Sequence, residues 1–424
     1  MSADPPSYYV ASATPPVARP RVSSDIEADV CVVGGGFTGL SAALHLAEAG
    51  ARVALAEAER VGFAASGRNG GQIHTGYRKT QAQLEQWLGE IHARDLWSLA
   101  EEAKTMQHEL TARHDINCAL KEGIIIAAHN KRAVKPLAED TEHLIRAYGY
   151  TDARMMNATE TAAVTGTDVY SAARFDKGGG HLHPLNFARG LACAAEAAGA
   201  VIYENSPALR MDDEGKRVTL VCDVGRVNAD HLLLACDAFT GALAPQLSKY
   251  IAHVESYITA TAPLPDALYD AVLPCGAAVA DTRHVLDYYR KSADRRMLFA
   301  GREAYWNPPQ DIAGLVRPRM LHVFPQLRDV AIDYAWRGTV GITVTRMPHF
   351  GRLSERVLFA HGYSGQGVAL SVMGGKLLAE AAMGHSKRFD VMARVPARAI
   401  PGGMLLRKPL VTAALLAYKI LDSF

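Results

Sequence analysis

The sequence has almost no net charge and no paired cysteines. It carries 45 basic and 44 acidic residues, for a net charge of +1. Proteins that bind nucleic acids concentrate positive charge, so we expect no nucleic-acid partner. The six cysteines include no CxxC pair, and several lie in apolar strand-like runs, where a thiol behaves as a small hydrophobe. This pattern is typical of a reducing compartment, and we predict a cytoplasmic protein without a disulfide framework.

Long apolar segments are also missing. Residues 1–26 are rich in Pro, Ser and Ala and lack the apolar core of a secretory signal, so we interpret them as an N-terminal arm. No run reaches the roughly 20 residues that a membrane-spanning helix needs. The apolar stretch Leu410–Leu421 is short and contains Lys419. We predict that residues 401–424 form a C-terminal helix docked on the protein, with membrane-surface contact as the alternative and no stable membrane insertion.

Two kinds of catalytic site lack support in the sequence. No GxSxG motif or Ser/His/Asp spacing indicates a hydrolase. His181 and His183 alternate along the chain, but no clustered Cys, Asp or Glu accompanies them. Zinc and related metals need three or four such ligands, so we predict no metal site.

A strand, a glycine turn and a helix follow the N-terminal arm. Ala28–Val33 is an apolar run typical of a buried parallel strand, and residues 34–39 have the spacing GxGxxG. Apolar residues then recur at helical spacing as far as Gly50, and Arg52–Ala56 is a second strand ending at Glu57. In such a βαβ unit the glycines let a pyrophosphate approach the helix N-terminus, while the acidic residue binds ribose hydroxyls.

Two more glycine-rich loops favour FAD over NAD as the nucleotide. Ser66–Gln72 combines glycines with Arg68, which suits a diphosphate and a flat ring. Far downstream, Gly362–Gly367 opens a helix whose N-terminal amides would stabilise negative charge on a reduced flavin. The predicted cofactor contacts are Gly34, Gly36, Phe37, Thr38, Gly39, Glu57, Ala58, Ser66, Gly67, Arg68, Asn69, Gly70, Gly71, Gln72, Gly362, Tyr363, Ser364, Gly365, Gln366 and Gly367.

The rest of the chain alternates between helical and strand-like patterns. Helices are predicted at 80–114, 131–148, 183–198 and 368–382. Strands are predicted at 123–128, 201–203 and 357–360, with a hairpin-like pair formed by 218–222 and 227–235. From 251 to about 334 the runs are strand-like, for example 257–261, 284–289 and 297–300. The nucleotide-binding pieces lie at the start, middle and end, so we expect interleaved domains.

Several segments resemble one family of flavoenzymes. They are Asp29–Ser41, Ser66–Gln72, Gly180–Asn186 and Arg346–Gly351. These segments resemble the D-amino-acid-oxidase-like family, which includes sarcosine and glycine oxidases. Within the family, the members that oxidise gamma-glutamylputrescine are most similar, and the likeness runs from about residue 7 to residue 407. That likeness also rests on Ser7–Tyr9, Leu286–Arg290, Gly362–Gly365 and Phe389–Asp390.

The resemblance implies an α/β (α+β) fold in which a Rossmann-like FAD domain is interleaved with a substrate domain. In the substrate domain, an antiparallel sheet would cover the reactive face of the flavin. We predict that residues 27–82, 178–243 and 335–400 form the FAD domain, and that residues 83–177 and 244–334 form the substrate domain.

The resemblance also implies details of cofactor binding. Glu57 would bind the adenosine ribose, the Arg68–Gly71 segment would line the flavin, and residues 362–367 would approach the far edge of its ring. Some members attach the flavin through a cysteine, but Gly341–Arg346 has none, so FAD should be non-covalent. Some place a lysine over the flavin for reaction with oxygen, and Met297–Arg302 offers none. Fast reoxidation by oxygen is therefore not implied, and the electron acceptor is oxygen or another compound.

We therefore predict an FAD-dependent enzyme that oxidises the amine of a small polar molecule to an imine by hydride transfer to flavin N5. Positioning of the substrate should supply most of the catalysis. The resemblance implies gamma-glutamylputrescine or another gamma-glutamylated polyamine as substrate. The alternatives are an N-methyl or D-amino acid, an aminoalkylphosphonate, or a flavin-free scaffold that binds another partner.

A gamma-glutamyl substrate calls for an elongated slot with a cationic anchor at its mouth. Aromatic side chains can pack along a methylene chain, and an arginine can hold a carboxylate. Strand alternation would place Tyr288 and Arg290 on one face and Tyr289 on the other. We predict Arg290 as the anchor. The candidate substrate residues are Tyr288, Tyr289, Arg290, Trp336, Arg346 and Tyr363, of which we assign catalytic roles to Tyr288, Arg290, Arg346 and Tyr363.

Overall fold

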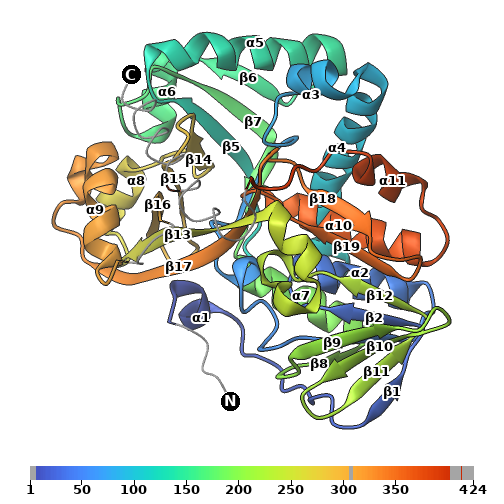
Figure 1. Cartoon of the computed structure of the whole chain (residues 1–424). Coiled ribbons are helices and arrows are strands. Elements are labelled where there is room, and N and C mark those ends of the chain that lie inside the picture. The colour runs from blue at the N-terminus through green and yellow to red at the C-terminus, as the bar shows by residue number, and fades with distance from the viewer. Residues whose placement is uncertain (1–5, 305–308, 402–411, 413–424) are drawn as a thin grey trace.

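The computed structural model describes residues 6–304, 309–401 and 412, with only the main chain described at 302–304. Two large sheets lie next to each other, and helices cover their outer faces (Figure 1). A small third sheet lies at the edge of the molecule, at the lower right of the figure. Across the described residues, no helix combines the length and apolar character that crossing a membrane would need.

The six-stranded sheet is the nucleotide-binding half of the fold. Its strand order is β18-β19-β12-β2-β3-β8, and every pair is parallel except β18 with β19. The central strands are buried on both faces, as expected for a parallel sheet. The strands are β2 (Val30–Val33), β3 (Val53–Ala56), β8 (Val201–Tyr203), β12 (His231–Leu234), β18 (His349–Arg352) and β19 (Val357–His361).

Three helices pack together against this sheet. They are α2 (Phe37–Glu48), α7 (Pro184–Ala197) and α10 (Gly367–Ala382), and their apolar faces form one large core. The α2 and α10 backbones approach closely at Gly375, where a Cβ would lie 2.2 Å from the carbonyl oxygen of Thr38. This contact joins a helix near the start of the chain to one near its end. The nucleotide-binding half is therefore built from segments that lie far apart in the sequence.

The nine-stranded sheet forms the second half. Its order is β17-β13-β16-β15-β14-β5-β7-β4, with β6 paired to β7, and all pairs are antiparallel except β14 with β5. The strands are β4 (Gln72–Ile73), β5 (Lys121–Ala128), β6 (Ala153–Met156), β7 (Ala172–His181), β13 (Ile251–Thr261), β14 (Ala278–Asp281), β15 (Tyr288–Lys291), β16 (Met297–Ala304) and β17 (Ile332–Thr343).

The remaining elements surround these two halves. The small sheet has the order β1-β11-β10-β9. Its strands are β1 (Asp25–Glu27), β9 (Ala208–Asp213), β10 (Val218–Cys222) and β11 (Arg226–Ala229). The other α-helices are α1 (Tyr8–Ser12), α3 (Gln81–Leu88), α4 (Glu90–Arg113), α5 (Lys131–Tyr148), α6 (Ala158–Thr165), α8 (Asp266–Ala271), α9 (Ile312–Val323) and α11 (Lys387–Ala393).

The predicted fold class is confirmed: a parallel nucleotide-binding sheet stands beside a largely antiparallel sheet. Three local predictions are wrong. The strand-like region 251–334 contains the helix α9, whose buried Val316, Met320 and Val323 follow helical spacing. The predicted strand 284–289 begins only at Tyr288. The predicted run 227–235 is split at residue 230 between the small sheet and the six-stranded sheet.

The N-terminal arm contains the helix α1 and the strand β1. The predicted C-terminal helix falls almost wholly outside the described residues. The division into domain segments stays a prediction, although β7 crosses residue 178 and both β4 and β17 belong to the nine-stranded sheet.

Candidate cofactor and substrate site

The turn between β2 and α2 has the geometry that a pyrophosphate needs. Gly34 has a φ of +109°, and a Cβ at Gly39 would lie 1.9 Å from the Gly34 carbonyl oxygen. Gly36 is the N-cap of α2 and provides no side-chain cap, while the Ser66 hydroxyl accepts a hydrogen bond from the Phe37 N–H at 2.9 Å. A helix N-terminus without a full side-chain cap suits an anion, so the turn fits the diphosphate of a dinucleotide.

Glu57 lies at the carboxyl end of β3, beside this turn. Its carboxylate accepts hydrogen bonds from the N–H groups of Gly35 at 2.5 Å and Glu59 at 2.9 Å. Burial raises the pKa of the Glu57 carboxyl, although these backbone donors act in the opposite direction. A carboxylate has about four acceptor positions, so two remain for ribose hydroxyls. The position next to the glycine turn is the one that ribose recognition requires.

The loop Ser66–Gln72 connects the two sheets. The Asn69 side chain holds its shape by accepting from the Gly71 N–H and donating to the carbonyl of Ala65. Gly71 has a φ of +72°, and a Cβ there would lie 2.0 Å from the Leu182 carbonyl oxygen. Gln72 donates to the Val279 carbonyl within the nine-stranded sheet. The glycines are therefore required by close backbone contacts, and the loop is held rigidly between the sheets.

Arg68 is tied to β17. Its Nε donates to the Arg337 carbonyl at 2.6 Å, and the Trp336 indole N–H donates to the Arg68 carbonyl at 3.0 Å. Both bonds connect the predicted flavin-lining loop to β17 of the nine-stranded sheet. Trp336, a candidate substrate residue, is thus placed against this loop.

The loop Gly362–Gly367 is held by a residue that the sequence analysis missed. Asp237, just after β12, accepts from the Gly362 N–H at 2.7 Å and from the Gly341 N–H at 3.2 Å. Gly362, Ser364 and Gly365 all have positive φ values. Burial raises the pKa of Asp237, against the effect of its backbone donors. An acidic residue at the carboxyl end of a parallel strand is a signal that could have identified it.

The predicted role of Tyr363 in substrate positioning disagrees with its placement. Its hydroxyl bonds to the Thr38 hydroxyl at 2.9 Å, and its ring packs edge-on to Phe350. The side chain belongs to the core beneath α2 and α10, where a Cβ at Gly374 would lie 2.4 Å from the Tyr363 oxygen. The positive φ of Gly362 and Ser364 turns this residue inward, so only its backbone remains near the loop.

Strand β15 presents its side chains as the alternation predicts. Tyr289 is buried toward α9, stacked on Phe299 with ring centroids 5.4 Å apart. Tyr288 lies on the opposite face, where its hydroxyl bonds to Ser256 at 3.0 Å and its ring would be 2.7 Å from a Cβ at Gly70. The face bearing Tyr288 and Arg290 is therefore the one that meets the loop Ser66–Gln72, which we predicted to line the flavin.

Arg290 is a buried cation that has no acidic partner among the described residues. Its side chain is 4% exposed, and its Nε donates to the Gly70 carbonyl at 2.7 Å. Its other hydrogen bonds go to the Lys291 carbonyl and the Tyr9 hydroxyl, and none of the described carboxylates pairs with it. Removing an unpaired charge from water is costly, so such a cation is expected to meet an anion when the site is filled. Because Arg290 is buried, it does not lie at the mouth of a slot as predicted.

Arg346 and the two histidines are held by other hydrogen bonds. Arg346 has a φ of +61° in the turn after β17, and its N–H donates to the Thr343 carbonyl. His181 bonds to the Gly276 carbonyl, whereas His183 bonds to the Ser12 hydroxyl. The histidines thus have separate partners. Within the described part of the chain, no three His, Cys, Asp or Glu side chains gather in a way that could hold a metal ion.

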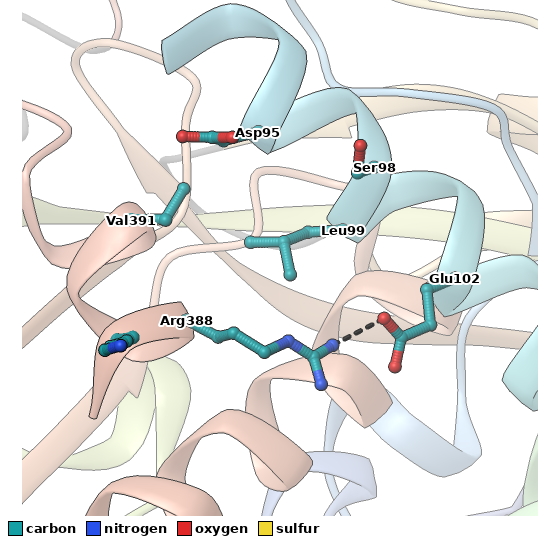
Figure 2. A pocket seen from close by; sticks show the side chains of 7 residues that line it. Asp95, Ser98, Leu99, Glu102, Arg388 and Val391 are labelled. Carbon is teal, nitrogen blue, oxygen red and sulfur yellow. Dashed lines mark hydrogen bonds and ion pairs between the residues drawn. The ribbon is translucent and has the colours of Figure 1, made fainter. Parts of the chain in front are cut away.

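A separate surface cleft of about 270 Å³ lies between α4 and α11 (Figure 2). In it the Arg388 guanidinium pairs with the Glu102 carboxylate at 2.5 Å, and a second carboxylate, Glu380, also binds Arg388. None of the predicted site residues lines this cleft. By contrast, a small cavity of about 10 Å³ is lined by Gly70, Gln72, Ile258, Tyr288, Tyr289, Arg290, Leu298 and Ala300.

The glycine turn, Glu57 and the two loops fit a dinucleotide-binding oxidoreductase whose parallel sheet stands beside a second, largely antiparallel sheet. Comparison with known proteins identifies the family. Residues 29–381 match the family described as DAO, FAD dependent oxidoreductase, and the chain belongs to it. The protein is an FAD-dependent oxidoreductase that acts on amine substrates.

Two curated proteins are similar to the chain over nearly its whole length. It is 38% identical to gamma-glutamylputrescine oxidoreductase of Escherichia coli, covering 98% of both chains. It is 37% identical to the probable oxidoreductase OrdL of Haemophilus influenzae, covering 99% of this chain and 97% of that protein. Among solved structures, glycine oxidase from Geobacillus kaustophilus has the same fold, with a TM-score of 0.72, 21% identity, and coverage of 84% of this chain and 95% of that chain.

Proposed function

We propose that the protein oxidises gamma-glutamylputrescine or another gamma-glutamylated polyamine at the carbon that bears the terminal amine. The product would be an imine, which water converts to an aldehyde and ammonia or an amine. The proposal is supported by the 38% identity to gamma-glutamylputrescine oxidoreductase over 98% of both chains. We also propose that FAD is held non-covalently and that oxygen or another acceptor reoxidises it.

The observation that carries the proposal is the buried Arg290 guanidinium. It faces the flavin-lining loop and has no ion pair with a described carboxylate. A gamma-glutamyl substrate brings a carboxylate at the end far from the reacting carbon, and an arginine can hold it with two parallel hydrogen bonds. Free putrescine brings no anion. The site is thus chemically matched to a carboxylated amine rather than to a diamine.

Bound FAD supplies the ring that accepts the electron pair. The protein residues have the tasks of holding the substrate and excluding water. Tyr288, Leu298 and Ile258 line the cavity of about 10 Å³ beside Arg290. That cavity has room for about one water molecule, so these side chains would have to move apart for a methylene chain to pack against them. Arg290 would fix the carboxylate end, so the amine end has a limited range of positions. Glu57 and the glycine turn would hold the nucleotide part of the cofactor in place.

A second candidate function follows from the same residue. Arg290 is only 2.7 Å from the Gly70 carbonyl, in the loop predicted to line the flavin. In an α-amino acid the carboxylate is adjacent to the oxidised carbon, so its anchor must lie close to the ring. The contact with Gly70 therefore favours oxidation of an N-methyl or D-amino acid, such as sarcosine.

Anaerobic flavin bleaching with a panel of amines tests both functions. The panel contains gamma-glutamylputrescine, putrescine, sarcosine, D-alanine and an aminoalkylphosphonate. We expect fastest bleaching with gamma-glutamylputrescine. Loss of one charge-assisted interaction costs roughly 1.5–3 kcal/mol, so putrescine should be about ten- to a hundredfold poorer. Equal rates with putrescine and its glutamylated form would contradict the proposal, and a preference for sarcosine would establish the second candidate.

A further inference from the structure

The N-terminal helix α1 is attached to the substrate half of the molecule. In Figure 1 it lies beneath β17. The Tyr8 hydroxyl donates to Asp294 at 2.5 Å, and Ser12 bonds to the His183 ring nitrogen Nε2 at 3.1 Å. Just beyond the helix, the Thr14 N–H donates to the Asn186 side chain at 2.8 Å. These bonds connect the arm to α7 and to the loop between β15 and β16. They fix the position of the arm relative to the nine-stranded sheet.

The second tyrosine of this helix reaches Arg290. Tyr9 is fully buried, and its hydroxyl oxygen accepts a hydrogen bond from the Arg290 Nη2 at 3.1 Å. Its ring packs edge-on against Trp336 and His183, with centroids 5.2 Å and 4.9 Å away. The hydroxyl uses its oxygen as an acceptor, and among the described residues nothing accepts its proton. One O–H donor therefore remains free beside a buried guanidinium.

The charges around this pair favour an anion. His181 and His183 lie near enough to Arg290 to feel its charge, and burial lowers the pKa of each to about 3, so both are neutral near pH 7. The Asp294 carboxylate, in the connection between β15 and β16, is already bound by Tyr8, Ser292 and Arg296. The positive charge of Arg290 is thus uncompensated by the described residues. A carboxylate in the cavity that Arg290 lines would meet its guanidinium, and the Tyr9 hydroxyl lies 3.1 Å from that guanidinium.

We propose that Tyr9 is a substrate-binding residue, which together with Arg290 binds the carboxylate of the amine substrate. The inference rests on the proposed function and extends it to the N-terminal arm. In this arrangement Arg290 polarises the Tyr9 hydroxyl by donating to its oxygen, and the hydroxyl donates its own proton to the carboxylate. The arm thereby helps to select amines that carry a carboxylate over amines that lack one.

The position of the arm in the sequence agrees with a role in selectivity. The family match begins at residue 29, so α1 lies outside the part of the chain that defines the family. The gamma-glutamylputrescine oxidoreductase, in contrast, is similar over 98% of both chains. An element added to a shared catalytic core is suited to set which member of a substrate class is accepted.

The test compares two substrates that differ by one carboxylate. They are gamma-glutamylputrescine and N-(4-aminobutanoyl)putrescine, its decarboxylated analogue. In Tyr9→Phe, which keeps the ring and removes the hydroxyl, we expect KM for the carboxylated substrate to rise about tenfold. Values of kcat for both substrates and KM for the analogue should stay within about twofold of wild type. Tyr8→Phe is the matched control on the same helix, because its hydroxyl bonds to Asp294 rather than to Arg290.

A binding measurement that needs no turnover accompanies the kinetics. Gamma-glutamylbutylamide carries the carboxylate but no terminal amine to oxidise, and its Kd for the holoenzyme is measured by calorimetry. We expect about tenfold weaker binding in Tyr9→Phe and unchanged binding in Tyr8→Phe. Equal losses for both substrates in Tyr9→Phe, or an unchanged Kd, would overturn the inference, because a purely structural tyrosine has no preference for the carboxylate.

The outcome separates this inference from the proposed substrate. If wild type instead prefers sarcosine, the proposed substrate is wrong, and the same comparison is made with sarcosine and dimethylamine. A selective loss of sarcosine binding in Tyr9→Phe would then still support the role of Tyr9. If wild type oxidises amines with and without a carboxylate equally well, neither Tyr9 nor Arg290 recognises a carboxylate, and both proposals fail.

Discussion

The Asp237 carboxylate accepts the Gly362 N–H at 2.7 Å, which joins the end of β12 to the loop that opens α10. Its second oxygen accepts the N–H of Gly341 in β17. The Asp237 side chain therefore connects the six-stranded sheet, the nine-stranded sheet and the loop predicted to approach the far edge of the flavin ring. The relative position of these three parts depends on a residue that contributes only hydrogen-bond acceptors.

Asp237→Asn should weaken this connection. An amide offers one acceptor oxygen in place of two, and its NH₂ group would face a backbone N–H. We expect the free energy of unfolding to fall by about 1–3 kcal/mol, with a lower FAD content after purification. Thermal melting and the flavin-to-protein absorbance ratio measure the two effects. Asp230→Asn, at the exposed opposite end of β12, is the control. Identical melting curves for the two variants would show that the Asp237 bonds contribute nothing.

The glycine turn makes a prediction that separates cofactor binding from folding. A Cβ at Gly36 would meet only the Ser66 side chain, at 2.9 Å, whereas a Cβ at Gly39 would meet the Gly34 backbone oxygen at 1.9 Å. We expect Gly36→Val to yield folded protein with little FAD, and Gly39→Ala to impair folding itself. Glu57→Ala should also fold and bind FAD more weakly, because the ribose acceptor is lost. Circular dichroism and flavin content distinguish these cases. Near-normal flavin in Gly36→Val would place the pyrophosphate elsewhere.

Much of the nucleotide-binding half and of strand β15 can be predicted from the sequence, because these elements depend on local sequence patterns. Apolar periodicity and glycine spacing give the βαβ unit around α2, and alternation gives the opposite faces of Tyr288 and Tyr289. The contacts of Asp237 and Tyr9 are different, because each joins segments more than 100 residues apart. No local sequence pattern predicts a hydrogen bond between segments so far apart. For Tyr363 the motif could be recognised in the sequence, but the direction of its side chain could not. The residues on either side have left-handed backbone conformations, and the ring points into the core.

The attachment of FAD can be tested directly. Gly341–Arg346 contains no cysteine, and its Gly341 N–H is engaged by Asp237. We expect acid or heat precipitation of the holoenzyme to release the yellow colour into the supernatant. The absorbance of supernatant and pellet is the measurement. Colour that stays with the protein pellet would demonstrate a covalent bond at another residue.

Tyr363→Phe tests whether that residue has the predicted catalytic role. Its hydroxyl bonds to Thr38 within the core, so removing it should cost about 0.5–1.5 kcal/mol of stability. Because no substrate contact is lost, we expect kcat/KM to stay within about twofold of wild type. Melting temperature and steady-state kinetics are measured on the same preparation. A tenfold loss of activity without a change in stability would restore the original prediction.

The buried histidines make the stability of the protein depend on pH. Burial lowers the pKa of His181, His183 and His361 to about 3 and that of His349 to about 4, from an ordinary value of 6.5. A histidine that must stay neutral in the folded state binds protons more readily once unfolded. Its stabilising contribution is therefore complete above pH 6.5 and is lost as the pH falls toward 4 and below.

His181 is the sharpest single test of this dependence. It is 1% exposed and bonds through Nε2 to the Gly276 carbonyl, and a glutamine amide can make the same donation without titrating. Between pH 6.5 and pH 5, one such histidine removes about 2 kcal/mol of stability. We expect the melting temperature of His181→Gln to fall less steeply over this interval than that of wild type. His385→Gln, at an exposed histidine, is the matched control. Parallel curves for wild type and His181→Gln would mean that His181 also protonates readily in the folded protein.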